Sequence, residues 1–182
     1  LTWDPETEVL VTAGATEALT SAVLALAGPG DEVLTLEPFY DSHAAAIALA
    51  GATHTTAPLI ASVHGFRLDL EALEAAITPR TRLILINTPH NPTGTVLNRS
   101  ELEAIAAAAI RADAVIMTDE VYEHLTYDGA VHIPLATLPG MAERTITISS
   151  AGKTFSFTGW KIGWATGPAH LIEALLTVKQ FL

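Results

Sequence analysis

The chain has 182 residues, of which 49% are hydrophobic, so its length and composition suit one domain with one buried core. Its 20 acidic and 9 basic residues give a formal net charge of −11, which argues against nucleic acid or an anionic membrane as the main partner. The absence of cysteine excludes disulfides and thiolate metal sites, and we expect no metal. The apolar runs are too short for a membrane span and no signal peptide is apparent, so we expect a cytoplasmic protein.

Short apolar runs rich in β-branched residues recur along the chain, each bounded by Gly, Pro, Asn or Asp, as expected of buried strands. They are Val9–Thr12, Glu32–Leu36, Thr53–Ala57, Leu83–Ile86, Ala114–Thr118 and Thr145–Ile148. Alanine-rich segments with helical spacing lie between most of them, at Thr16–Ala27, Ser42–Ala50, Leu70–Ile77 and Ser100–Arg111. This alternation predicts an α/β fold in which helices cover both faces of a mostly parallel sheet.

The two ends of the sequence favour a piece of a longer protein. The first residues run into an apolar stretch without a start methionine, and Leu171–Leu182 is a helical pattern without a stop signal. Near the middle, Ser100 precedes two glutamates and is a candidate N-cap for its helix. No linker or low-complexity segment divides the chain, so we expect one domain.

In sheets of this kind, ligands collect at the carboxyl ends of the strands, and the informative residues directly follow the expected strands. The segment Gly14-Ala15-Thr16 turns from a strand into a helix, where backbone amides can approach an anion. An ordinary turn with Thr16 as the helix cap is the alternative. Tyr40 follows the next strand and can stack on a planar ring, or it is an ordinary tyrosine.

Two further segments carry polar side chains after apolar strands. The turn at residues 87–94 is stiffened by two prolines, and its asparagines, Asn91 among them, offer side-chain donors. Asp119 ends an apolar strand and therefore needs a buried cation or donor, although no arginine or lysine is near it in sequence. The alternative is that Asp119 caps a helix, in which case Tyr122 lies one turn further on the same side.

The last of these segments carries two lysines. Lys153 stands among small and apolar residues, and its burial would favour the neutral, nucleophilic amine. Ser150 and Lys161 supply a hydroxyl and a cation that suit a phosphate. Two solvated loop lysines are the alternative. Taken together, the five segments meet the needs of pyridoxal 5′-phosphate (PLP): an anion cradle, a stacking ring, partners for the pyridine nitrogen and the phenolate oxygen, and an amine. A dinucleotide site is disfavoured because no G-x-G-x-x-G follows a strand.

Four motifs resemble the class I/II aminotransferases among the fold-type I PLP enzymes, and look closest to the branch with the kynurenine, methionine-type and N-succinyldiaminopimelate aminotransferases. They are Asn91-Pro92-Thr93-Gly94, Thr118-Asp119-Glu120-Val121-Tyr122, Ser150-Ala151-Gly152-Lys153 and Gly159-Trp160-Lys161-Ile162-Gly163. The resemblance implies that residues 1–182 are the PLP-binding large domain, a three-layer αβα sandwich with a mostly parallel seven-stranded sheet. It also implies that the family's N-terminal arm and small C-terminal domain are missing.

The resemblance also implies roles for individual residues. Lys153 would form the Schiff base with the cofactor and then carry the proton during transfer. Asp119 would pair with the pyridine nitrogen and keep it protonated. Tyr122 and Asn91 would contact the phenolate oxygen, and Tyr40 would stack on the ring.

By the same resemblance, the phosphate would be held by the amides of Ala15 and Thr16, the Ser150 hydroxyl and the Lys161 ammonium. Many relatives have arginine at the position of Lys161, and lysine offers a point charge without a bidentate fork.

The implied activity is transfer of an amino group from an amino acid to a 2-oxo acid, in amino acid metabolism, by a homodimer that binds neither nucleic acid nor membrane. Two alternatives stay open. One is a PLP-dependent carbon–sulfur β-lyase of the same fold, which would use the same lysine. The other is an inactive, truncated domain that binds PLP weakly or only packs against a partner. The motifs do not specify which amino acid or 2-oxo acid is used.

Overall fold

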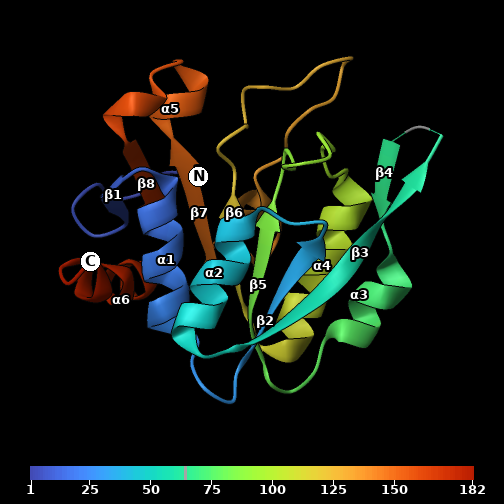
Figure 1. The fold of residues 1–182 in the computed structure, drawn as a ribbon, viewed down its shortest axis with the longest axis horizontal. Helices are drawn as coiled ribbons and strands as arrows, with labels where there is room; N and C mark the ends of the chain where they lie inside the picture. Colours follow the sequence, from blue (N-terminus) through green and yellow to red (C-terminus); the bar gives the residue numbers. More distant parts are fainter. Residues whose placement is uncertain (64) are drawn as a thin grey trace.

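The computed structural model describes residues 1–63 and 65–182. Within them the chain forms one eight-stranded sheet with the order β1-β8-β7-β6-β5-β2-β3-β4 (Figure 1). The strands are β1 (Val9–Ala13), β2 (Glu32–Glu37), β3 (Thr53–Ser62), β4 (Gly65–Leu68), β5 (Thr81–Asn87), β6 (Val115–Asp119), β7 (Thr145–Ser150) and β8 (Ile162–Thr166). Strands β7, β6, β5, β2 and β3 pair in parallel, whereas β8 is antiparallel to both of its neighbours and β4 is antiparallel to β3.

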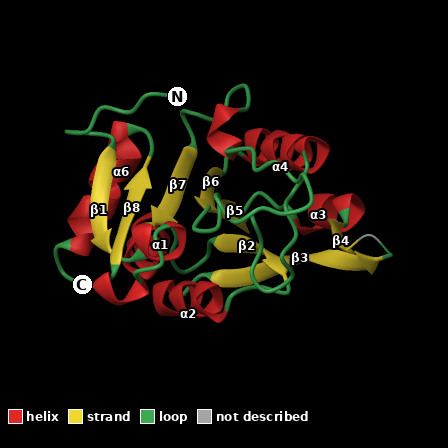
Figure 2. Cartoon of the chain, turned by 90° about the horizontal axis from the view of Figure 1, so that it is seen from above, coloured by secondary structure: helices red, strands yellow, loops and turns green. Residues whose placement is uncertain are grey.

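Helices cover both faces of this sheet. One face carries α1 (Ala15–Leu26), α2 (Asp41–Ala50) and α6 (Ala169–Lys179), and the other carries α3 (Leu70–Ala76) and α4 (Arg99–Ala112). Figure 2 shows α1 and α2 on one side of the strands and α4 on the other. The predicted three-layer αβα architecture is confirmed.

The central strand β5 shows why two layers of helices are needed. Its side chains alternate: Leu83 and Leu85 pack with α1 and α2, and Ile84 and Ile86 pack with α3 and α4. Each strand of a parallel sheet is apolar on both faces and must be covered on both. At about 25 cal/mol per Å² of apolar surface, burial on both faces is the main stabilising term of the fold.

The prediction of seven strands is wrong by one, because the described residues form eight. The apolar pattern missed β4 and β8, and it ended β3 at Ala57. Only Leu68 is buried in the four-residue strand β4. Two of the five residues of β8 are glycine or alanine, so β8 has no run of large apolar side chains. Strand β4 is stabilised by pairing with β3, the strand just before it in the chain, and β8 by pairing with β1, which is distant in sequence. An apolar pattern does not report either pairing.

Helix ends also differ from the expectations. Asn98, and not Ser100, caps α4: its side chain accepts from the amide of Glu101, while the Glu101 carboxylate accepts from the amide of Asn98 in a capping box. Helix α6 ends at Lys179, three residues before the expected end. A short helix α5 (Ala151–Thr154) and two 3₁₀ turns, η1 (Leu135–Thr137) and η2 (Thr158–Trp160), were not predicted.

Parallel pairing places the carboxyl ends of β2, β5, β6 and β7 along one edge of the sheet, the upper edge in Figure 1. The first turn of α1 and the whole of α5 lie at the same edge. Among the described residues, no helix has both the length and the apolar character needed to cross a membrane.

Gly163 lets β8 lie directly against the turn that begins α1. A Cβ atom at this position would lie 2.4 Å from the carbonyl carbon of Gly14 and 2.6 Å from the amide nitrogen of Ala15. Gly14 itself has φ 80° and ψ 169°, a conformation that side-chain-bearing residues rarely adopt. The close approach of the two backbones therefore requires glycine at residue 163, and the backbone conformation requires glycine at residue 14.

We expect Gly163→Ala to destabilise the domain by about 1–3 kcal/mol, because the added methyl group must push β8 away from the start of α1. The control is Gly159→Ala, since a Cβ at residue 159 meets open space. Urea unfolding of both variants measures the effect. Equal midpoints for the two variants would contradict this account of the packing.

Candidate active site

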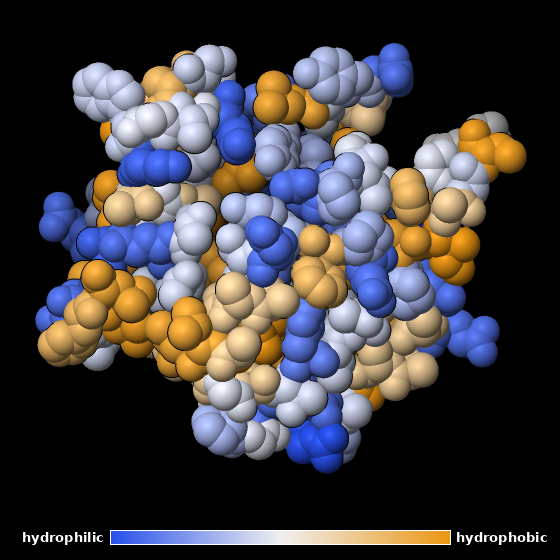
Figure 3. All heavy atoms as spheres, viewed as in Figure 1, coloured by the Kyte–Doolittle hydropathy of each residue, from blue (hydrophilic) through white to orange (hydrophobic). Residues whose placement is uncertain are grey.

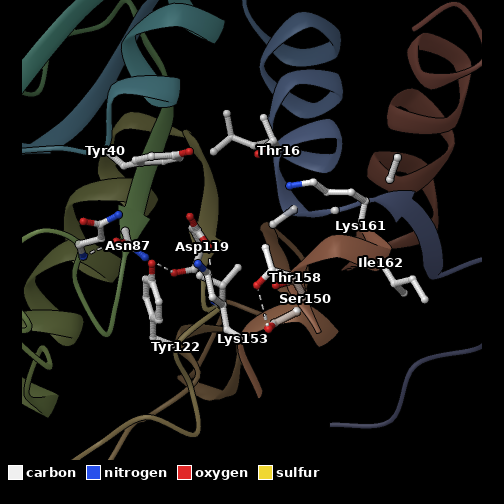
Figure 4. Close-up of a pocket in the computed structure, with 17 residues that line it drawn as sticks. Thr16, Tyr40, Asn87, Asp119, Tyr122, Ser150, Lys153, Thr158, Lys161 and Ile162 are labelled. Carbon is white, nitrogen blue, oxygen red and sulfur yellow. Dashed lines mark hydrogen bonds between the residues drawn. The ribbon is translucent and has the colours of Figure 1, made fainter. Parts of the chain in front are cut away.

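A cavity of about 480 Å³ opens at the carboxyl edge of the sheet (Figure 4). All nine residues singled out by sequence line this one cavity, although they come from segments spread over most of the chain. They are Ala15, Thr16, Tyr40, Asn91, Asp119, Tyr122, Ser150, Lys153 and Lys161. Asn87 and Thr158 also line it and were not predicted as site residues.

The start of α1 forms one end of the cavity. Gly14 is the N-cap, and no described side chain caps this helix, so its first amides are available to a ligand. The interpretation of Thr16 as the cap is therefore wrong, since Thr16 lies within the first turn. The ammonium group of Lys161 points into the cavity near Thr16 (Figure 4). A helix N-terminus and a nearby cation together make an anion site.

Asp119 lies at the other side of the cavity, at the end of β6, and is 6% exposed. Its Oδ1 accepts from the amide of Val121 at 3.3 Å, and the nearest ion-pair partner of its Oδ2 is His43 Nε2 at 3.7 Å. No helix begins at Asp119, so the helix-cap interpretation is wrong. A buried carboxylate with only long contacts retains capacity for one strong donor.

His43 is the basic residue near Asp119 that the sequence did not reveal. It is 2% exposed, and neither ring nitrogen has a hydrogen-bond partner among the described residues. His43 comes from α2, far from Asp119 in sequence, and the search for a partner near Asp119 therefore missed it. The feature of the sequence that could have drawn attention to His43 is its short spacing from Tyr40. In the structure the two rings meet edge-on, with their centroids 5.8 Å apart.

The turn after β5 is tied to Asp119 through the backbone. The side-chain nitrogen of Asn87 donates to the carbonyl of Asp119 at 2.8 Å, and its side-chain oxygen accepts from the amide of Asn91 at 2.6 Å. The amide of Thr88 donates to the same Asp119 carbonyl at 3.2 Å. Asn87 thus fixes the position of Asn91 relative to Asp119. The feature of the sequence that could have identified Asn87 is its position as a polar residue at the end of an apolar strand.

Lys153 lies on α5, with its Nζ 5.6 Å from the centroid of the Tyr122 ring. Its placement at the cavity is as predicted, but the expected burial is wrong, because the residue is exposed. The reason is its position on a short helix at the open edge of the sheet, with the exposed Phe155 and Trp160 nearby in the chain. Within this chain, α5 and its surroundings do not exclude water from the amine.

A protein-family model described as aminotransferase class I and II matches residues 1–182. The chain belongs to the aminotransferase class I and II family. It is 61% identical to the probable N-succinyldiaminopimelate aminotransferase DapC of Mycobacterium tuberculosis over 180 residues, which make up 99% of this chain and 45% of that protein. Kynurenine–oxoglutarate transaminase 3 of Homo sapiens is 49% identical over 185 residues, covering 97% of this chain and 41% of that protein.

Solved structures of aminotransferases share the fold closely. The N-succinyldiaminopimelate aminotransferase of Mycobacterium tuberculosis superposes with a TM-score of 0.98 at 60% identity, over 100% of this chain and 47% of that one. YbdL of Escherichia coli, described with a methionine aminotransferase function, gives a TM-score of 0.94 at 39% identity, over 100% and 47%. The chain thus spans about half the length of the relatives it matches.

In this aminotransferase-family chain, His90 links two of the segments that line the cavity. Its Nδ1 lies 2.9 Å from Thr93 Oγ1, and its ring faces the carbonyl of Pro38, two residues before Tyr40. Burial lowers the pKa of His90 to about 4; the Pro38 carbonyl opposes this shift, and nearby His43 adds to it. His90 therefore stays neutral at pH 7 and keeps both contacts.

The lowered pKa of His90 predicts a loss of stability in acid. As the pH falls from the ordinary histidine value of 6.5 to about 4, the unfolded chain binds a proton at this residue and the folded chain does not. His90→Asn should therefore reduce the fall in unfolding free energy between pH 7 and pH 4. Urea titrations at several pH values measure the slope, with exposed His124→Asn as the control. An unchanged slope in His90→Asn would show that His90 does not drive this dependence.

Proposed function

We propose that this chain is the PLP-binding large domain of an aminotransferase, which passes an amino group from an amino acid to a 2-oxo acid. The observation that carries the proposal is that Lys153 and Asp119 line one cavity together with the anion-binding start of α1. Membership of the aminotransferase class I and II family supports the reaction class.

The residues present fit PLP. The cavity volume of about 480 Å³ lies within the roughly 300–1,000 Å³ typical of small-molecule sites. The amides of Ala15 and Thr16, with the Ser150 hydroxyl and the Lys161 ammonium, would hold the phosphate. Asp119, whose carboxylate has only long contacts, would accept the hydrogen bond of a protonated pyridine nitrogen.

PLP, when bound, supplies an aldehyde that links covalently to amines and a ring that accepts electrons from the substrate α-carbon. The protein residues control the charges around it. The Asp119 carboxylate would keep the ring nitrogen protonated, because a buried carboxylate with only long contacts favours a positive partner. The Tyr122 hydroxyl and the Asn91 side chain would donate to the phenolate oxygen. Tyr40, in the segment after β2, would lie against the ring face.

Lys153 has two tasks in this proposal. Its amine would hold the cofactor covalently, and its Nζ, when free, would take the proton from the substrate α-carbon and deliver it to the cofactor carbon that bears the nitrogen. A proton carrier must reach the reacting atoms. The position of Lys153 Nζ, 5.6 Å from the Tyr122 ring centroid, places the amine beside the group proposed to contact the phenolate oxygen.

Chemical trapping tests the assignment of Lys153. Borohydride reduction in the presence of PLP should label Lys153, as read by peptide mass mapping, and Lys153→Ala should abolish the label. Lys179→Ala is the control, because Lys179 lies on α6 with its ammonium 3.9 Å from Glu17 Oε2, away from the cavity. A label at Lys161, or an undiminished label in Lys153→Ala, would reject the assignment.

The PLP-loaded protein, without borohydride reduction, distinguishes transfer from elimination. An aminotransferase converts PLP to its amine form when given an amino donor alone, whereas a carbon–sulfur β-lyase releases pyruvate. N-succinyldiaminopimelate is the first donor to assay, given the similarity to the mycobacterial protein of that name. A cysteine S-conjugate, which carries a sulfur leaving group on its β-carbon, is the substrate for the elimination assay. Pyruvate release from it without conversion of the cofactor would favour the lyase.

We further propose that the protein works as a cytoplasmic homodimer. Two exposed apolar surfaces of this chain support packing against further polypeptide. One is an aromatic cluster of Phe155, Phe157 and Trp160 next to Lys153, with successive ring centroids 6.0 and 6.1 Å apart. The other covers α6, where hydrophobic side chains gather on the face shown in Figure 3.

Trp160→Glu should weaken the dimer, because it places a charge where a 76% exposed aromatic side chain would be buried by the partner. Sedimentation velocity measures the shift from dimer to monomer. Ile60→Glu, at the opposite end of the sheet and 52% exposed, is the control. Dimers of unchanged stability in Trp160→Glu would exclude the aromatic cluster from the interface.

A further inference from the structure

The carboxylate next to Asp119 in sequence makes a buried contact that the proposed mechanism does not use. Glu120 continues the sheet, since its amide donates to the carbonyl of Ile148 at 2.8 Å. Its side chain is 1% exposed, and its Oε2 accepts from His132 Nε2 at 2.7 Å. The His132 side chain is 7% exposed. Side chains of successive strand residues point to opposite faces, so Asp119 and Glu120 serve different sides of the sheet.

This contact closes the base of the loop at residues 120–132, which carries Tyr122. The loop projects beyond the carboxyl edge of the sheet in Figure 1, and its outer residues Tyr127 and Val131 are each 73% exposed. Two backbone hydrogen bonds shape its first turns, from Glu123 to Glu120 and from Leu125 to Tyr122. Without the contact to His132, the returning half of the loop would lose its link to the end of β6.

Burying this contact has a cost in the free energy of folding. Among the described residues, Glu120 Oε1 and His132 Nδ1 are buried without a hydrogen-bond partner. Burying a polar pair in this incomplete way costs more than burying two apolar side chains of similar size. What a directional hydrogen bond adds over apolar packing is a defined position for the groups that it joins.

We propose that Glu120 and His132 form a clamp that positions Tyr122 in the cavity. The role assigned to Tyr122 rests on the proposed function, whereas the clamp itself does not. A second anchor lies on the other side of Tyr122, where Glu123 Oε1 accepts from the Ser149 hydroxyl at 2.6 Å. Tyr122 is thus flanked by two carboxylates, each fixed to a buried partner on a different segment. The clamp prevents the loop from moving the Tyr122 hydroxyl away from the cofactor.

Four variants of the protein that contains this chain test the clamp. His132→Leu removes the donor and leaves the Glu120 carboxylate buried without a partner. The double variant Glu120→Leu, His132→Leu replaces the pair by apolar side chains. Glu120→Gln keeps a carbonyl oxygen that accepts from His132 Nε2. Asp128→Asn is the control, because it removes one carboxylate charge, as Glu120→Gln does, at an exposed position of the same loop.

The first readout is backbone hydrogen exchange of residues 121–131 without PLP, which does not depend on catalysis. We expect exchange to rise at least about tenfold in His132→Leu and in the double variant, because the loop opens locally more often. Exchange in β6 should stay unchanged in all four variants. Exchange in the loop should stay unchanged in Glu120→Gln and in Asp128→Asn. Unchanged loop exchange in both Leu variants would overturn the clamp, whatever the result of the Lys153 labelling.

The second readout separates positioning from plain stabilisation. The double variant should regain the thermal stability lost in His132→Leu, since apolar pairs replace buried polar ones well. Its kcat should nevertheless stay about tenfold or more below that of the wild type with KM within about twofold, because a catalytic group displaced by an ångström loses rate. Glu120→Gln should retain kcat. If the double variant recovers both thermal stability and kcat, the pair is only structural and the proposal fails.

Discussion

The buried carboxylate of Asp119 at the end of β6 is the constraint around which the site is arranged. Its strand lies in the middle of the sheet, so the segments after β5 and β7 flank it on both sides. Its carbonyl accepts from Asn87 and Thr88, and its side chain faces His43 on α2. A charge in this position is tolerated only if the surroundings supply a partner. The need for that partner links the core of the fold to the chemistry of the cavity.

The cavity is electrostatically polarised, and two kinds of local structure produce the polarity. At one end, the glycine backbones at residues 14 and 163 approach closely and expose the start of α1, with Lys161 beside it. At the other end, Asp119 carries the negative charge. A ligand with an anionic group and a protonated nitrogen at its two ends matches this arrangement. Neither end depends on the net charge of the protein, which is strongly negative.

Buried polar contacts help to hold the loops above the sheet. His90 joins the turn of Asn91 to the segment of Tyr40, and Glu120 joins the loop of Tyr122 to His132. Each contact therefore lies in a segment that carries a residue proposed to touch the cofactor. Directional hydrogen bonds suit this task, because they fix position where an open cavity leaves little surface to pack against.

The sequence by itself determined the layer order and the nine cavity residues, because strand-end positions and strand–turn–helix motifs are local and parallel pairing brings them to one edge. It did not determine β4 and β8, whose strand character comes from pairing with β3 and β1 and not from an apolar pattern of their own. Nor did it reveal His43 or His132, since each meets its carboxylate only after the chain has folded. The exposure of Lys153 was likewise decided by tertiary structure: local composition predicts an apolar setting, but burial depends on what packs over α5.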